Sequence, residues 1–337
     1  MSEEPTLVAR REGAAGTLLM NRPRALNALD TGMIAAFQAV LDAWKDDASV
    51  RLVVLEGAGG RAFCAGGDVR RIREQAIAGD TAGVEGFFAG EYRVNRGIAE
   101  FGKPWVSLID GLCMGGGIGV SVHGRPRVVS EHAMLAMPET AIGLFPDVGT
   151  SWVLPRLPGA LGYWLALTGA RMQGADAVHA GLADHYVPRA RLAELRAALL
   201  GGEAGVVARF AEALPESSFA PHRAAIARCF GQPDLPAILA ALEAEGTDWA
   251  AEQIATLRRM SPTSLAVSLE LLRRGAGSTL AECLERELRL TRVVVNRHPD
   301  FREGVRSVLV DKDGAPRWTP ARIEELDPAA IASMFEG

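Results

Sequence analysis

The stretch "VRLVVLEGAGGRAFCAGGDVRRI", residues 50–72, indicates the class of fold. It begins with a β-branched apolar run of the length of a buried strand, continues as a glycine-rich loop, and becomes a basic helical segment from Val69 onward. A strand that is followed at once by a tight loop and a covering helix is typical of layered α/β proteins. We therefore expect an α/β fold in which this unit recurs.

The same unit recurs on both sides of this stretch. Before it, "TLLMN" (17–21) has the pattern of a strand, and an amphipathic helix is predicted after Asp30. After it, "WVSLIDG" (105–111) and "RVVSEHAMLAMPE" (127–139) supply further strands. This alternation predicts strands covered by helices.

The chain changes character near residue 190. Beyond that point Ala, Leu, Glu and Arg recur at helical spacing, and prolines such as Pro215 and Pro233 mark turns. The sequence therefore predicts a core over residues 1–190 that holds the active site, and a helical region over residues 191–337 that packs on this core.

The overall composition argues against several classes of partner. A net charge of −5 gives no general attraction to nucleic acid or to an anionic membrane. The start "MSEEPTLVAR" lacks the basic flank and the apolar run of a signal peptide, and no apolar stretch approaches the length of a membrane span. With 48% hydrophobic residues, the chain can bury a substantial core. We expect a cytoplasmic protein that binds neither nucleic acid nor membrane.

The cysteines and histidines give no sign of a metal site. The four cysteines form no C-x-x-C pair, and the six histidines are scattered without a metal-ligand spacing. We expect reduced, buried thiols and no bound metal.

Two glycine clusters follow predicted strands, "CAGGD" (64–68) and "MGGGIG" (114–119). Glycine lets backbone N–H groups approach a ligand closely, and two such groups aimed at one point would form an oxyanion hole. Taken alone, each cluster is better explained as a tight turn or a close strand-to-helix contact. Neither matches a phosphate-binding loop or a Rossmann fingerprint. Ser121 lies outside any G-x-S-x-G pattern, so we expect it to be a buried structural residue.

Four segments together resemble the crotonase (enoyl-CoA hydratase/isomerase) superfamily. They occur in the family's order and are "NRPRALNALD" (21–30), "GAGGRAFCAGGDVRRI" (57–72), "KPWVSLIDGLCMGGGIG" (103–119) and "PETAIGLFPDVG" (138–149). "LPRLPGALGYWLALTG" (154–169) and "HPDFREGVRSVLVDKDGAPRWTP" (298–320) extend the resemblance toward the 3-hydroxyisobutyryl-CoA hydrolase subfamily. The resemblance implies the ββα spiral of the crotonase fold.

Glu139 and Asp147 decide which reaction the resemblance implies. Hydratases of the family share the acid at Glu139 but carry a second glutamate where this chain has Gly119. Adding water to an alkene needs both carboxylates, so the loss of one argues against hydration. Asp147 matches the acid of the hydrolases instead. The resemblance therefore implies cleavage of 3-hydroxyisobutyryl-CoA, or a related 3-hydroxyacyl-CoA, to the free acid and CoA, a step of valine degradation.

The resemblance also assigns roles to the catalytic residues. The thioester carbonyl oxygen is expected to lie between the backbone N–H groups of Ala65 and Gly116. Glu139 would act on the thioester carbon, either as a nucleophile that forms an anhydride or as the base for a water. Asp147 would hold the 3-hydroxyl group. We also expect the two acids, in a pocket with apolar walls, to titrate as a coupled pair.

Further residues are expected to bind the substrate. The resemblance places a pocket glutamate at Glu91 and a basic residue near the CoA phosphates at Arg24. Asp68 is expected to cap the helix after the first glycine cluster. The remaining expected binding residues belong to the glycine clusters and are Gly66, Gly67 and Gly115.

Two other functions stay open from the residues alone. One is a hydratase or isomerase of the same fold, and the other is a non-catalytic acyl-CoA-binding protein. Coenzyme A is part of the expected substrate, and no separate cofactor is expected. The family commonly forms homo-oligomers, and the resemblance leaves the oligomeric state open.

Overall fold

The computed structural model describes residues 5–336, which form two compact units. The first unit comprises the chain up to Gly67 together with Gly90–Ala136 and Arg171–Ser218. The second comprises Asp68–Ala89, Met137–Ala170 and the chain from Phe219 onward. Each unit is therefore assembled from three separate segments of the chain.

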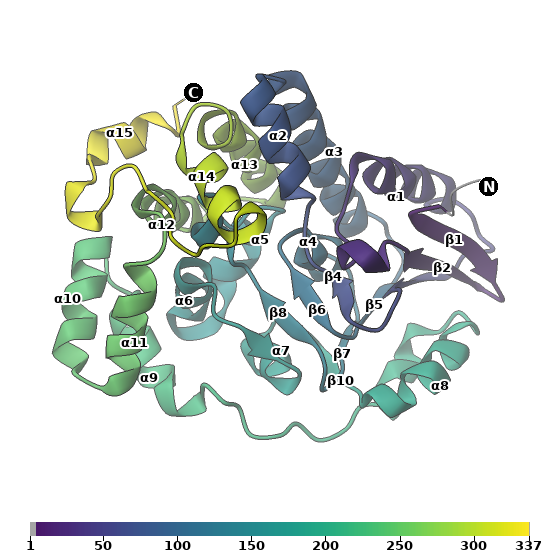
Figure 1. The fold of residues 1–337 in the computed structure, drawn as a ribbon. Helices are drawn as coiled ribbons and strands as arrows, with labels where there is room; N and C mark the ends of the chain where they lie inside the picture. Colours follow the sequence, from purple (N-terminus) through teal and green to yellow (C-terminus); the bar gives the residue numbers. More distant parts are fainter. Residues whose placement is uncertain (1–4, 337) are drawn as a thin grey trace. The chain divides into compact units, whose positions relative to one another are not determined.

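The first unit contains two sheets, visible in the centre and at the right of Figure 1. The larger has six strands in the order β1-β2-β3-β5-β7-β10. Its β1–β2 pair is an antiparallel hairpin, and the remaining pairs are parallel. Its strands are β1 (Leu7–Glu12), β2 (Ala15–Met20), β3 (Leu52–Gly57), β5 (Trp105–Ile109), β7 (Arg127–Val129) and β10 (His185–Tyr186).

The smaller sheet has four strands in the order β4-β6-β8-β9. Pairs β4–β6 and β6–β8 are parallel, and β9 is antiparallel to β8. Its strands are β4 (Ala62–Cys64), β6 (Leu112–Met114), β8 (Met134–Ala136) and β9 (Met172–Gln173). The two glycine clusters follow β4 and β6, which are neighbours in this sheet, so the sheet brings the two loops to the same edge.

Helices cover the larger sheet of the first unit. Buried side chains of β3, β5 and β7 pack on α8 and on the 3-10 helix η5, in a cluster that includes Val54, Val128 and Leu195. Helix α1 begins where Asp30 Oδ1 accepts the Met33 N–H at 2.7 Å. The helices of this unit are η1 (Pro23–Ala25), α1 (Thr31–Trp44), α4 (Gly116–Val122), α7 (Ala175–Ala180), α8 (Arg189–Leu199) and η5 (Ala204–Arg209), and α3 (Thr81–Ala99) contributes to both units.

The second unit is helical. Its first helix is α2 (Val69–Ala78). After its share of α3 come η2 (Glu139–Ile142), α5 (Thr150–Val153), η3 (Leu154–Arg156), η4 (Pro158–Ala160) and α6 (Leu161–Thr168). The C-terminal part adds η6 (Ala220–His222), α9 (Arg223–Phe230), α10 (Leu235–Glu245), α11 (Asp248–Leu257), α12 (Pro262–Ala276), α13 (Leu280–Val294), α14 (Asp300–Val305), η7 (Arg306–Val310), η8 (Ile323–Glu325) and α15 (Pro328–Ser333).

Most elements predicted from the sequence are confirmed. The runs at 17–21, 50–57, 105–111 and 127–139 contain strands, α2 begins at Val69, and helices dominate after residue 190. The units, however, do not divide at residue 190, because α8 belongs to the first unit while α2, α5 and α6 belong to the second. Composition identifies helices but not which helices pack together.

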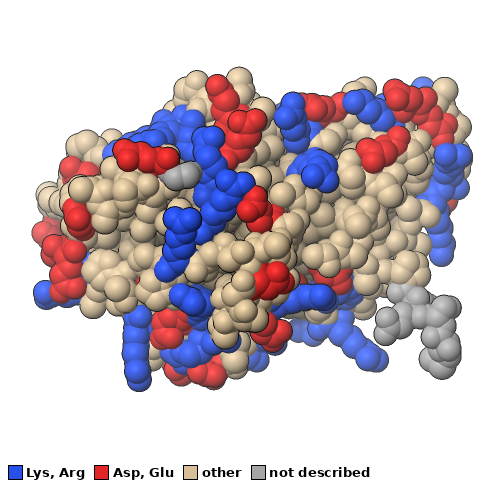
Figure 2. Space-filling view, turned by 90° about the horizontal axis from the view of Figure 1, so that it is seen from above, with Lys and Arg blue, Asp and Glu red and all other residues tan. Residues whose placement is uncertain are grey.

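The structure also bears on the predictions about the cysteine thiols, the surface charge and membrane spans. All four cysteines are free and buried. Figure 2 shows Lys and Arg side chains interspersed with Asp and Glu over the face seen there. No helix within residues 5–336 is long and apolar enough to cross a membrane. The start of the chain, on which the signal-peptide prediction rests, lies partly outside these residues.

Candidate active site

In the first unit, the two glycine loops pack backbone against backbone. A side chain at Gly66 would lie 3.2 Å from the Met114 carbonyl oxygen and 3.7 Å from the Gly116 nitrogen. Gly66 and Gly115 adopt φ angles of 104° and 47°, which L-residues with side chains rarely tolerate. A side chain at Gly117 would overlap the Cys64 carbonyl oxygen. The glycines therefore permit close contact between the loops.

The N-terminal segment 21–30 is the support of the first glycine loop. The Leu29 N–H donates to the Gly66 carbonyl oxygen at 2.8 Å, and the Ala65 N–H donates to the Leu26 carbonyl oxygen at 3.0 Å. The Asn27 amide donates to the carbonyl oxygens of Ala58 and Ala62 at 2.9 and 2.8 Å. Segment 21–30 therefore holds the backbone of the first glycine loop in place.

This network corrects one predicted oxyanion donor. The Ala65 N–H already donates to Leu26, so the prediction that Ala65 points its N–H at the substrate is wrong. The Gly67 nitrogen instead lies near Gly116, 3.3 Å from the position that a side chain on Gly116 would take. Within the first unit, Gly67 and Gly116 are therefore the better placed pair of donors.

Glu91 lies beside this pair. Glu91 is 2% exposed, and a side chain on Gly116 would overlap its Oε1 atom. The structure thus brings Glu91, Gly67 and Gly116 together, and their role in binding the substrate stays a prediction. Arg24 lies exposed in η1 of the same unit. Its predicted contact with CoA phosphates stays a prediction.

Glu139 is the first residue of η2 in the second unit and is 5% exposed. Neighbouring elements fix this short helix from two directions. The Thr140 carbonyl oxygen accepts the Ser261 N–H at the start of α12 at 3.1 Å, and the Thr140 hydroxyl donates to the Leu167 carbonyl oxygen of α6 at 3.3 Å. A buried carboxylate on a well-anchored turn suits a group that must act at a defined point.

Helix α14 packs on the end of η2 so closely that neither glycine at the contact could carry a side chain. A side chain on Gly143 would overlap the Asp300 backbone, and one on Gly304 would overlap the Ile142 backbone. Asp300 itself is fully buried and accepts hydrogen bonds from the Ser261 hydroxyl and the Thr319 N–H. Burial raises the pKa of Asp300. The late segment 298–320 is therefore a support for the turn that carries Glu139.

Asp147 follows η2 and is 4% exposed. Its carbonyl oxygen accepts both the N–H and the hydroxyl of Thr150, at 2.9 and 2.7 Å. Val148 and Gly149 between them adopt positive φ angles of 53° and 78°. The Asp147 backbone is thus fixed by a tight turn that leads into α5.

The structure adds Glu287, an acid that the sequence analysis did not single out. Glu287 lies in α13, is fully buried, and accepts hydrogen bonds from the residues that follow Asp147. One glutamate in a helical stretch rich in Ala, Leu, Glu and Arg gives no sequence signal of burial.

Asp68 differs from its prediction in detail. It occupies the N-cap position of α2, as expected, but its side chain makes no capping hydrogen bond to the described residues of that helix. The φ and ψ angles of −75° and 68° differ from the extended conformation usual at such caps. The predicted N-cap position is therefore confirmed, and the predicted capping bond to the described residues of α2 is wrong.

Two other side chains of the first unit are unsuited to act as nucleophiles. Burial raises the pKa of the Cys64 thiol to about 12, so it stays protonated. The Ser121 hydroxyl donates to the Gly117 and Ile118 carbonyl oxygens of its own helix, which confirms the structural role predicted for it.

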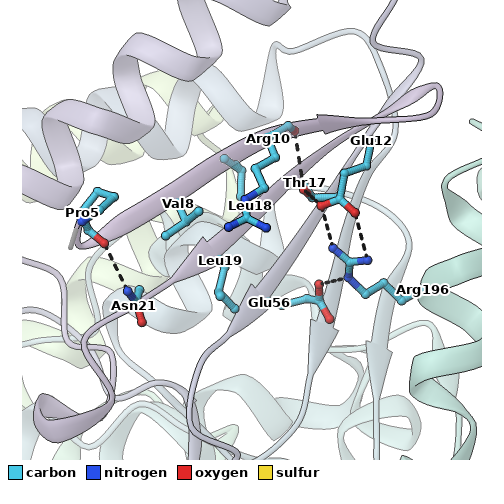
Figure 3. Close-up of a pocket in the computed structure, with 10 residues that line it drawn as sticks. All are labelled: Pro5, Val8, Arg10, Glu12, Thr17, Leu18, Leu19, Asn21, Glu56 and Arg196. Atoms are coloured by element: carbon cyan, nitrogen blue, oxygen red, sulfur yellow. Dashed lines mark hydrogen bonds and ion pairs between the residues drawn. The ribbon is translucent and has the colours of Figure 1, made fainter.

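A pocket of about 550 Å³ lies away from the predicted site residues, on the surface formed by β1, β2, β3 and α8 (Figure 3). Arg196 bonds Glu12 at 3.0 Å and Glu56 at 2.7 Å, and the Thr17 hydroxyl also donates to Glu12. None of the predicted site residues lines it. This pocket is therefore a surface feature of the larger sheet.

Comparison with protein families decides the relationship. The family model for enoyl-CoA hydratase/isomerase matches residues 15–335. The chain belongs to the enoyl-CoA hydratase/isomerase family. The predicted resemblance and the crotonase fold are thereby confirmed.

Several members of this family are similar over nearly the full length. The chain is 43% identical to the mitochondrial 3-hydroxyisobutyryl-CoA hydrolase of Rattus norvegicus, over 99% of the chain and 90% of that protein. Its identity to the Homo sapiens protein of that name is 41%, over 98% and 88%.

Solved structures of the family include a carnitinyl-CoA dehydratase from Mycobacterium thermoresistibile, 41% identical, with a TM-score of 0.93 over 98% of this chain and 96% of that one. An enoyl-CoA hydratase from Rhodobacter sphaeroides is 44% identical, with a TM-score of 0.92 over 98% and 97%. The names of family members thus include both thioester hydrolases and enzymes that add or remove water.

Proposed function

We propose that this protein is a hydrolase that cleaves the thioester of 3-hydroxyisobutyryl-CoA, or of a related 3-hydroxyacyl-CoA. The observation that carries the proposal is the pair of buried acids, Glu139 and Asp147, combined with Gly119 at the position of the second hydratase acid. Gly119 lies inside α4 and is itself buried. The names of the curated relatives support the same reaction.

In the proposed mechanism, the thioester carbonyl oxygen accepts hydrogen bonds from the Gly67 and Gly116 N–H groups. These donors stabilise the negative charge that develops on this oxygen when the carbonyl carbon is attacked, and one such donor typically contributes about 3 to 4 kcal/mol. Glu139 supplies the attack, either directly, with expulsion of the CoA thiolate and later hydrolysis of an anhydride, or by removing a proton from the attacking water.

Asp147 accepts a hydrogen bond from the substrate's 3-hydroxyl group. A buried site built around such a bond discriminates strongly against an acyl group without the hydroxyl, because the carboxylate would then be left without its partner. This role makes Asp147 the residue that selects hydroxyacyl over simple acyl thioesters.

A hydratase is the second candidate, because solved relatives carry that name. The two reactions are separated by mixing the protein with 3-hydroxyisobutyryl-CoA and following free thiol and enoyl absorbance together. We expect stoichiometric thiol release with no change in enoyl absorbance. A change in enoyl absorbance without thiol would favour the hydratase, and binding without either signal would favour an acyl-CoA-binding protein.

The place of action and the assembly stay predictions. The relatives cited are named mitochondrial, so they do not support the cytoplasmic location expected from the sequence. Homo-oligomer formation is likewise a prediction, which a mass measurement of the protein in solution would test.

A further inference from the structure

Helix α13 of the second unit carries an acid in an unusual environment. Glu287 is fully buried, with Cys283, Leu284 and Leu290 among the buried residues of the same helix. A buried carboxyl group is costly unless hydrogen bonds replace the water that it loses. The burial of Glu287 is therefore tolerated only if neighbouring groups form hydrogen bonds with it.

The partners of Glu287 are Gly149 and Ser151, which follow Asp147 by two and four residues. Its Oε2 atom accepts the Gly149 N–H at 2.8 Å, and its Oε1 atom accepts the Ser151 N–H at 3.3 Å and the Ser151 hydroxyl at 2.5 Å. Gly149 is the N-cap of α5, so Glu287 satisfies N–H groups at the start of that helix from a distant part of the chain.

This arrangement links Glu287 to Asp147 through one turn. Thr150 lies between the two residues bound by Glu287, and its N–H and hydroxyl both bond the Asp147 carbonyl oxygen. The turn has two consecutive positive φ angles, at Val148 and Gly149, so it needs external contacts to hold its shape. Glu287 supplies three of them.

The two acids also interact through their charges. Burial first, and then the charge of Asp147, raise the pKa of Glu287 to about 8. Hydrogen bonds from Ser151 and Gly149 act in the opposite direction and lower this pKa. At neutral pH Glu287 therefore mostly retains its proton, which avoids two adjacent buried negative charges.

We propose that Glu287 is a positioning residue for Asp147, which it orients by holding the Gly149–Ser151 turn from α13. The inference rests on the proposed function, because it assumes that Asp147 binds the 3-hydroxyl group. Glu287 does not touch the substrate in this account. Its loss should therefore weaken the recognition of the hydroxyl and leave the attack on the thioester in place.

A double-mutant cycle tests the proposal. The variants are Glu287→Gln, Asp147→Asn and the pair combined, and the readout is kcat/KM for 3-hydroxyisobutyryl-CoA and for isobutyryl-CoA, which lacks the hydroxyl. Glu287→Gln keeps one acceptor oxygen but puts an NH2 group, which cannot accept a hydrogen bond, in place of the other. We expect it to lower the value for the hydroxylated substrate about 10- to 100-fold and the value for isobutyryl-CoA less than about 3-fold. The combined variant should fall no further than Asp147→Asn.

Asp176→Asn is the matched control. Asp176 is a buried acid of the first unit that accepts the N–H and the hydroxyl of one serine, Ser218, as Glu287 does with Ser151. This variant should leave the ratio of the two substrates unchanged. If Glu287→Gln does not fold, Ser151→Ala removes one contact, keeps the acid, and should shift the ratio in the same direction.

The outcomes distinguish a failure of the positioning role of Glu287 from a failure of the proposed function. Equal losses on both substrates, or losses that multiply in the combined variant, would overturn the positioning role of Glu287 while leaving the proposed function intact. If Asp147→Asn itself leaves the ratio of the two substrates unchanged, the role of Asp147 in the proposed function fails.

Discussion

Gly116 lies where several groups of the first unit approach one another. A side chain there would overlap Glu91 Oε1 and would lie 3.0 Å from Leu29 Cδ1 and 3.3 Å from the Gly67 nitrogen. The space beside this glycine is the space in which the proposed oxyanion would form. A single methyl group is therefore enough to disturb the site.

The prediction at this scale concerns Gly116→Ala. We expect the added methyl group to push Glu91 and the Gly67 N–H out of position, so that kcat for thioester cleavage falls about 10²- to 10³-fold, and we expect the overlap to lower the melting temperature as well. Gly205→Ala is the control, because a side chain there meets nothing within 4 Å. Thiol-release kinetics on the two variants measure the effect. Equal activity in both would contradict the assignment of Gly116.

At the scale of single residues, some site residues can be identified from the sequence and others only from the structure. Glu139 and Asp147 stand out in the sequence as acids in an apolar segment, but their predicted roles come from the family resemblance and not from that pattern. The choice between Ala65 and Gly67 could not be made from the sequence, because it depends on which N–H the Leu26 carbonyl oxygen accepts. Glu287 was missed because its burial arises from packing between distant elements.

At the scale of elements, η2 and α14 meet through their backbones. Gly143 has a φ of 70° and contacts Asp300, and Gly304 contacts Ile142. Neither contact can be relieved by a side-chain rotation, because the atoms on the far side belong to the main chain. The position of Glu139 therefore depends on a helix more than a hundred residues later in the sequence.

Gly304→Ala tests this dependence. A glycine-to-alanine change inside a helix normally stabilises it by up to about 1 kcal/mol, whereas here the overlap should lower the free energy of unfolding by about 1 to 3 kcal/mol. Urea unfolding measures both effects. Gly277→Ala, at an open position after α12, should be neutral or stabilising. A stabilised Gly304→Ala variant would contradict the packing described.

A strand could be predicted where its own residues form a recognisable apolar pattern. The buried parallel strands β3 and β5 are continuous apolar runs and were found. Strand β1, "LVARRE", was not, because an edge strand with mostly exposed polar residues has neither an apolar run nor a clear alternation. Its partner β2 defines it through hydrogen bonds rather than through its own composition.

For the whole molecule, the raised pKa of Glu287 makes stability depend on pH. The folded state holds this proton up to about pH 8, whereas a glutamate in the unfolded chain releases it near its ordinary pKa of 4.5. Between these values the folded state binds more protons, so the free energy of unfolding should fall as the pH rises. Above about pH 8 this contribution no longer changes.

Glu287→Gln removes this dependence. We expect the stability difference between wild type and variant, measured by denaturant unfolding, to move in favour of the variant as the pH is raised from 5 to 8.5. A difference that stays constant over this range would mean that Glu287 is ionised throughout and that its buried environment is not as described.

The organisation of the whole molecule was only partly predictable. The crotonase fold followed from four motifs in register, which family comparison confirms. The division into units did not follow, since Asp68–Ala89 and Met137–Ala170 join the C-terminal helices through contacts far apart in sequence. Long-range packing of this kind leaves no mark in local composition.

The most direct test of the account is the rate of CoA thiol release from 3-hydroxyisobutyryl-CoA by wild type and by Glu139→Gln, which keeps the shape of the side chain but removes its charge. We expect rapid release by wild type and a loss of about 10²- to 10⁴-fold in kcat for the variant, with the melting temperature nearly unchanged. Undiminished thiol release by a folded Glu139→Gln protein would contradict the central claim.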